Sequence, residues 1–128
     1  MADVSKRALI LFAHGSRDAR WAQPFLRLRD MLRMQMPGVA VELAFLDLMK
    51  PRLPGLIDLL AGSGKDTVTV VPVFFGQGAH VLHDLPLLID AARVRHPRVE
   101  VALAEAVGES EAVLHAIAAY CMDATKSQ

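Results

Sequence analysis

The sequence predicts an α/β domain built on a single doubly wound, four-stranded parallel sheet in the order 2-1-3-4, flanked by helices. Apolar runs alternate strictly with segments of helical period along the chain. The runs over residues 8–13 and 67–74 are apolar almost throughout, which is typical of strands covered by helices on both faces. Because crossovers between parallel strands are right-handed, this repetition winds helices onto both faces.

The strands are short apolar stretches separated by turn residues. They are expected over residues 8–13, 39–45, 67–74 and 99–104. The first is followed by His14 and Gly15, and the third by the turn Gly76-Gln77-Gly78. That turn lacks the third glycine of a dinucleotide-binding fingerprint, so we interpret it as a flexible loop over which a flat ligand can approach the backbone.

Four helices connect and follow these strands. The first is expected over residues 21–36, with Pro37 and Gly38 after its end. Pro51 begins the second, which Gly62 ends. The third is expected over 79–95, closed by His96 and Pro97, and the last over 110–122. Val113, Ile117 and Tyr120 form an apolar stripe on the last helix.

Length and charge restrict the class of protein. The 128 residues fit one domain over 1–128, with residues 1–7 and 123–128 expected to be loose. A hydrophobic content of 53% excludes a disordered chain. The 14 basic and 14 acidic residues cancel, which argues against nucleic-acid partners because phosphate contacts need a basic field.

One cysteine and the absence of long apolar runs give further limits. Cys121 stands alone, so an internal disulfide and a cysteine-rich zinc site are excluded, and it is expected to be a small buried residue. No segment approaches the roughly 18 apolar residues of a membrane span, and residues 1–7 contain no apolar stretch long enough for a signal peptide. A cytoplasmic protein without a membrane partner is therefore expected.

Polar side chains collect where the strands end. His14 follows the first strand, Asp47 the second, His80 the third and Glu105 the fourth. The carboxyl ends of parallel strands share one edge of the sheet, and ligands bind there at the point where strand order reverses. In the order 2-1-3-4, that point lies between the strands that precede His14 and His80. We therefore expect these groups to meet at one edge.

Imidazole and carboxylate groups together suit borderline divalent metals such as cobalt, iron, nickel or zinc. The same groups act as general bases near neutral pH. Alternatives stay open: His14 can be a turn residue, and Asp47 can cap the helix that begins near Pro51. His83 shares a helix face with His80, as a further ligand or as a surface residue.

These residues resemble a known family. The motifs are His14-Gly15-Ser16-Arg17, Phe45-Leu46-Asp47, and Gly78-Ala79-His80-Val81 with Asp84-Leu85-Pro86. In combination and order they are similar to the small CbiX-type sirohydrochlorin cobaltochelatases, class II chelatases related to the siroheme ferrochelatases. The resemblance extends from about Leu9 to Val107.

The resemblance implies ATP-independent insertion of a divalent metal into sirohydrochlorin, in tetrapyrrole and cobalamin biosynthesis. His14 and His80 are then metal ligand and proton acceptor, with His83 a possible further ligand. Asp47 stands where the siroheme enzymes usually have glutamate. Co²⁺ is the favoured metal substrate, with Fe²⁺ or Ni²⁺ as alternatives, and no permanently bound cofactor is expected. The chain resembles one chelatase lobe, which implies a homodimer.

Sirohydrochlorin is a flat polycarboxylate, so it needs cations around its edge and apolar walls at its face. The predicted substrate-binding residues are Ser16, Arg17, Arg20, Gly76, Gln77 and Gly78. Lys50 and Arg52 add charge near Asp47. The candidate walls are Trp21, Phe75 and Leu82.

Two other functions compete with chelation. A phosphoryl-transfer enzyme of the histidine phosphatase type needs an arginine before the histidine of the first strand, but Ala13 stands there. A non-enzymatic protein that binds and delivers a tetrapyrrole or metal uses the same ligands, so the sequence leaves this alternative open.

Overall fold

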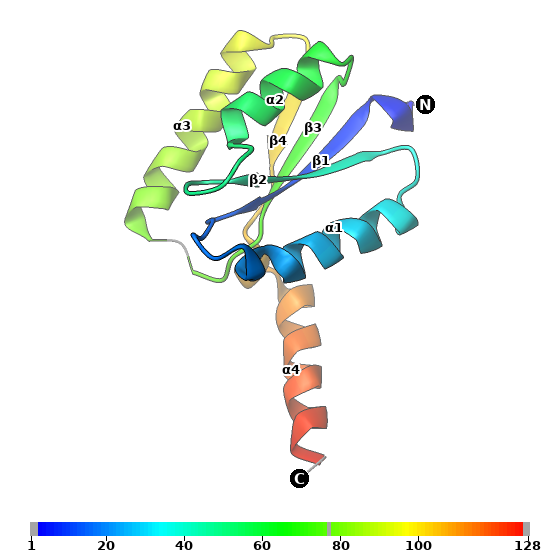
Figure 1. Ribbon diagram of the computed structural model, residues 1–128, viewed down its shortest axis with the longest axis vertical. Coiled ribbons are helices and arrows are strands. Elements are labelled where there is room, and N and C mark those ends of the chain that lie inside the picture. Colours follow the sequence, from blue (N-terminus) through cyan, green and yellow to red (C-terminus); the bar gives the residue numbers. More distant parts are fainter. Residues whose placement is uncertain (1–2, 77, 127–128) are drawn as a thin grey trace.

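The protein contains the predicted four-stranded parallel sheet (Figure 1). The computed structural model describes residues 3–76 and 78–126, without the side chains of Ala79, His80 and Leu82. The strands pair in the order β2-β1-β3-β4, which confirms the predicted topology. Their bounds are β1 (Arg7–Ala13), β2 (Ala40–Phe45), β3 (Thr67–Pro72) and β4 (Glu100–Leu103).

The helices lie close to their predicted positions. They are α1 (Gln23–Gln35), α2 (Leu53–Gly62), α3 (Ala79–Arg95) and α4 (Glu111–Lys126), with short 3₁₀ turns η1 (Val4–Lys6), η2 (Ala19–Ala22) and η3 (Val107–Glu109). The α1 helix begins later than predicted because η2 occupies the preceding turn. In the part of the chain that the structure describes, no helix is both long enough and apolar enough to cross a membrane.

The structure of the two chain termini differs from one expectation. Residues 1–7 and 123–128 were expected to be loose, but the described part of each end is structured. Asp3 caps η1 by accepting a hydrogen bond from the Ser5 backbone amide, and β1 already begins at Arg7. At the other end, α4 continues to Lys126.

Two apolar clusters lie on opposite faces of the sheet. The larger packs α2 and α3 onto one face, where Ile10, Val68 and Ile57 are fully buried. The smaller packs α1 onto the other face over β1 and β2, through residues such as Leu11 and Phe25. The sheet therefore has helices on both faces, although the α1 cluster of the described residues lies mainly over β1 and β2.

The last helix departs from the expected arrangement. It leaves the body of the domain and projects away from it (Figure 1). Cys121 on α4 is exposed, so the expectation that it is a small buried residue is wrong. The predicted stripe of Val113, Ile117 and Tyr120 is present on α4, but Tyr120 is 75% exposed.

An ionic cluster joins the end of α3 to α2, and the residues that it connects are distant in the sequence. Asp58 accepts hydrogen bonds from His96 Nε2 at 2.6 Å and Arg95 Nε at 3.1 Å. The bond from His96, followed by that from Arg95, lowers the pKa of the Asp58 carboxyl. A carboxyl with a lowered folded-state pKa stabilises the fold above its unfolded value of about 3.9, and this stabilisation is lost as the pH falls through the folded-state pKa.

We therefore predict that Asp58→Asn lowers the free energy of unfolding at about pH 7, by less than about 1 kcal/mol because the cluster is largely exposed. The difference from the wild type should shrink as the pH falls through the lowered folded-state pKa of Asp58, because protonation removes the charge of the carboxyl. Urea denaturation over a series of acidic pH values measures it. Asp90→Asn, which removes an exposed ion pair within α3, is the matched control. A difference that persists unchanged in acid would contradict the prediction.

Candidate functional site

His14 and Asp47 are held side by side at the carboxyl edge of the sheet, the edge at which the parallel strands end. The Leu46 backbone amide donates to the Ala13 carbonyl at 2.9 Å. The Asp47 amide then donates to the His14 carbonyl at 3.1 Å. The β1–β2 hydrogen-bond ladder thus continues beyond the two strands, and it fixes the backbones of both predicted site residues.

Gly15 makes this close approach possible. Its φ is +97°, in the region that favours glycine, and a Cβ at this position would overlap the carbonyl oxygen of Asp47. The glycine of the His14-Gly15 motif is therefore required both by its own conformation and by the neighbouring loop.

The imidazole of His14 is half-buried and available for chemistry. Its ring centroid lies 4.5 Å from that of Phe74. The ring nitrogens form no hydrogen bond with any described residue. A neutral imidazole keeps a lone pair on one nitrogen, which can bind a divalent ion or accept a proton.

Asp47 is exposed, and its Oδ1 accepts a hydrogen bond from the Leu48 amide at 2.9 Å. Leu48 has a φ of +68°, so the loop turns sharply at this point. The N-cap position of α2 is Arg52, which makes no side-chain capping bond. The alternative in which Asp47 caps this helix is therefore wrong.

The other predicted ligands lie around α3 and β4. His80 is in the first turn of α3, but its side chain lies outside the described part of the structure. His83 is exposed one turn later. Glu105 is exposed and lines a separate hollow beside Pro72 and Pro86. Among the described residues, no three His, Cys, Asp or Glu side chains form a group that could hold a metal ion.

The turn before α3 is open to solvent. Gly76 and Gly78 are exposed, and a Cβ on either would meet no atom within 4 Å. Gln77 lies outside the described residues. Gly108 in η3, which the sequence analysis missed, supports this turn: its amide donates to the Phe74 carbonyl at 3.3 Å, and a Cβ there would overlap the Phe75 backbone. The two segments are distant in the sequence, so no sequence pattern predicts this contact.

The residues after His14 differ in what they contact. Ser16 Oγ accepts a hydrogen bond from the Asp18 amide at 3.1 Å. Arg20 forms an ion pair with Asp18 at 3.0 Å, and its hydrogen bonds lower the pKa of the Asp18 carboxyl. Arg17 is exposed and makes no hydrogen bond or ion pair among the described residues. Of the two arginines predicted to bind substrate, Arg17 has its guanidinium uncommitted.

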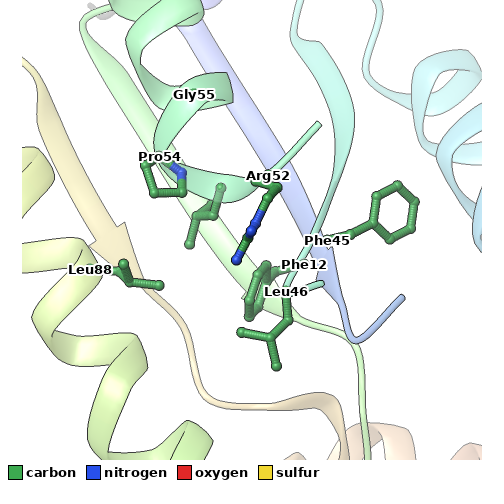
Figure 2. Close-up of a pocket in the computed structure, with 8 residues that line it drawn as sticks. Phe12, Phe45, Leu46, Arg52, Pro54, Gly55 and Leu88 are labelled. Carbon is green, nitrogen blue, oxygen red and sulfur yellow. The ribbon is translucent and has the colours of Figure 1, made fainter. Parts of the chain in front are cut away.

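A groove runs from Asp47 between α2 and α3. One part is a hollow of about 270 Å³ whose lining includes Phe12, Leu46 and Arg52 (Figure 2). Arg52 points toward Phe12 and Leu46 in this view. An adjoining hollow of about 460 Å³ is lined by Asp47 and Asp84. Leu46, Arg52 and Leu88 border both hollows, so an apolar wall and a cation lie beside the carboxyl edge.

The fold, with His14 and Asp47 at its carboxyl edge, is that of a small α/β metal chelatase. The family comparison is more specific, because residues 8–124 match the model of the CbiX family. The chain therefore belongs to the CbiX family, which confirms the predicted family and class.

The relatives agree with this assignment. The sirohydrochlorin cobaltochelatase of Sulfurisphaera tokodaii is 28% identical over 105 residues, which cover 82% of each chain. The crystal structure of a CbiX protein from Marinobacter aquaeolei matches with a TM-score of 0.82 and 30% identity, over 95% of this chain and 99% of that one.

The chain also matches part of a longer relative. The sirohydrochlorin chelatase SirB from Bacillus subtilis, solved in complex with cobalt, matches with a TM-score of 0.75 and 25% identity. The match covers 91% of this chain but 50% of SirB. The present chain therefore corresponds to about half of SirB.

The approach of the two loops can be tested at Gly15. We predict that Gly15→Ala lowers the free energy of unfolding by roughly 2–4 kcal/mol, because strained φ and steric overlap both contribute. Gly64→Ala is the matched control, since Gly64 has a φ of +94° but open space around it. Urea denaturation of both variants separates the two contributions. Equal losses would show that the Asp47 loop does not constrain position 15.

Proposed function

We propose that this chain is a sirohydrochlorin chelatase that inserts a divalent metal, Co²⁺ in the first place, into the tetrapyrrole without ATP. The observation that carries the proposal is the half-buried His14 imidazole, which lies at the carboxyl edge without a hydrogen bond to any described residue. Membership of the CbiX family and similarity to proteins named as sirohydrochlorin chelatases support the substrate.

His14 serves two steps of the proposed reaction. The ion must lose bound water, and the ring must lose its pyrrole protons. A neutral imidazole can hold the incoming ion and, once the ion has passed to the ring, accept a proton near neutral pH. Asp47, held next to His14 by the backbone, passes protons to solvent from its exposed position. His80 is the proposed second imidazole.

The tetrapyrrole binds across the open turn after β3. The exposed Phe75 offers apolar surface to the ring face. Arg17 and Arg52 offer cations to carboxylates at the ring edge, Arg52 from within the groove. A polycarboxylate substrate therefore meets cations from the loop after His14 and from the groove.

The metal is a substrate in this proposal, and no resident cofactor is involved. Cobalt is favoured because the relatives named above include a cobaltochelatase and SirB with bound cobalt. Ferrous iron and nickel accept the same ligands, so the siroheme and nickel branches are the alternatives. Two copies are proposed to form the working enzyme, since the chain corresponds to half of SirB. A cytoplasmic location stays a prediction.

The proposal is tested by mixing the protein, sirohydrochlorin and Co²⁺ and following the visible spectrum of the metallated product. Parallel anaerobic reactions with Fe²⁺ and Ni²⁺ establish the metal preference. Insertion should be faster with protein than without it, and fastest with Co²⁺. A protein that binds both substrates but leaves the insertion rate unchanged would be a delivery protein instead of a chelatase.

We predict that His14→Ala lowers the insertion rate by on the order of 10²–10⁴, the range typical of a lost general base. His115→Ala removes an exposed imidazole on α4 and is the matched control, expected to keep the parental rate. Circular dichroism verifies that both variants fold. Parental insertion by His14→Ala would remove this residue from the mechanism.

We further predict that Arg17→Ala raises KM for sirohydrochlorin about tenfold with little change in kcat, since a cation that only binds the substrate stabilises ground and transition states alike. Arg20→Ala should change KM less, because its guanidinium is held by Asp18. Steady-state kinetics with saturating metal measures both. A larger effect at Arg20 than at Arg17 would reverse this assignment.

A further inference from the structure

Arg52 borders both hollows of the groove between α2 and α3. We call the hollow of about 270 Å³ the Phe12 hollow and the hollow of about 460 Å³ the Asp47 hollow. The other described residues that line the Phe12 hollow are uncharged. The guanidinium of Arg52 points toward Phe12 and Leu46 (Figure 2). It forms no hydrogen bond or ion pair with any described residue, so it is available to an anionic group.

The backbone of Arg52 is fixed relative to His14. Phe45, the last residue of β2, forms a parallel bridge with Arg52, and its amide donates to the Pro51 carbonyl at 2.9 Å. The amides of the next two residues donate to carbonyls at the end of β1. Residues 45–47 thus join the segment that contains Arg52 to the segment that contains His14. The Arg52 side chain therefore starts from a defined position relative to the imidazole.

The volume of the Phe12 hollow limits what can enter it. Pockets that enclose a drug-sized ligand have volumes of roughly 300–1,000 Å³. A hollow of about 270 Å³ is therefore too small for a tetrapyrrole ring, but it has room for one flexible side arm. Leu46, Pro54 and Leu88 offer apolar surface to the methylene groups of such an arm. The guanidinium of Arg52 can bind a carboxylate at its end through two parallel hydrogen bonds.

The Asp47 hollow is less favourable for the same carboxylate. Asp47 and Asp84 both border this hollow, and like charges repel each other. Neither acid lines the Phe12 hollow. A substrate carboxylate that enters the groove is therefore most stable on the Phe12 side of Arg52.

We propose that the Phe12 hollow is a subsite for one carboxylate side arm of the tetrapyrrole, and that Arg52 is the positioning residue that binds this arm. An arm bound there anchors the ring at its edge, so the ring cannot turn freely in its plane beside His14. Fixed orientation of a substrate toward a reacting group accelerates a reaction. This subsite deepens the proposed function and rests on it for the identity of the substrate.

Binding of metal-free sirohydrochlorin, followed by its fluorescence, tests the cation without any insertion step. Arg52→Gln should weaken binding about tenfold, because it removes a hydrogen bond between charged groups. Arg52→Lys keeps the charge but loses the paired donors, so it should recover part of the affinity. The matched control is Arg98→Gln, which changes an exposed arginine near the amino ends of the strands and should bind like the wild type. Equal affinities of Arg52→Gln and Arg98→Gln would overturn the proposal.

Gly55→Leu tests the space. Gly55 borders the Phe12 hollow in the first turn of α2, and a Cβ there meets no atom within 4 Å, so the fold tolerates the change. The leucine side chain should compete with the arm and weaken sirohydrochlorin binding although Arg52 is intact. Gly62→Leu, at an equally open position at the other end of α2, is the control. Circular dichroism verifies both folds. Equal affinities of the two leucine variants would refute the hollow as the subsite.

Insertion kinetics at saturating Co²⁺ separate this subsite from the proposed function. Arg52→Gln should raise KM for sirohydrochlorin and also lower kcat several-fold, because a ring without its anchor has fewer productive orientations. An unchanged kcat would refute the positioning role. If the wild type binds sirohydrochlorin through Arg52 but inserts no metal, the proposed function alone is wrong. If Arg52→Gln and Gly55→Leu insert metal at parental KM and kcat, the subsite alone is wrong.

Discussion

The hydrogen bonds that carry the β1–β2 ladder past the ends of its strands are the constraint on which the site depends. They hold His14 and Asp47 through their backbones, and Gly15 permits the approach by lacking a side chain. Because the main chain does the positioning, the His14 imidazole needs no hydrogen bond from a neighbouring side chain. A group with an uncommitted lone pair can take up an ion and release it again, which the proposed insertion requires.

The ion pairs separate cations that are held by a protein carboxylate from a cation that is available to a ligand. Arg95 and His96 are committed to Asp58, and Arg20 to Asp18. Among the described residues, Arg17 at the carboxyl edge makes no such pair. A polycarboxylate binds most favourably to cations that need not first be released from a protein partner. The local bond between Arg20 and Asp18 therefore separates two arginines that look equivalent by position.

The strand order and the meeting of His14 with Asp47 were predictable because they follow from general rules: apolar runs give parallel strands, and parallel strands end at one edge. The contact of Gly108 with Phe75 was not, since it joins distant segments whose loop shapes no periodicity encodes. The prediction that Cys121 is buried was wrong for a related reason. The pattern of α4 predicts an apolar face, but it contains no information about which surface that face covers.

That ambiguity gives α4 its significance. A helix that folds back on its own sheet and one that crosses to another copy satisfy the same apolar pattern, so the sequence specifies the contact without specifying the copy. None of the described residues of α4 is buried, so its apolar stripe does not fold back on the sheet of this chain.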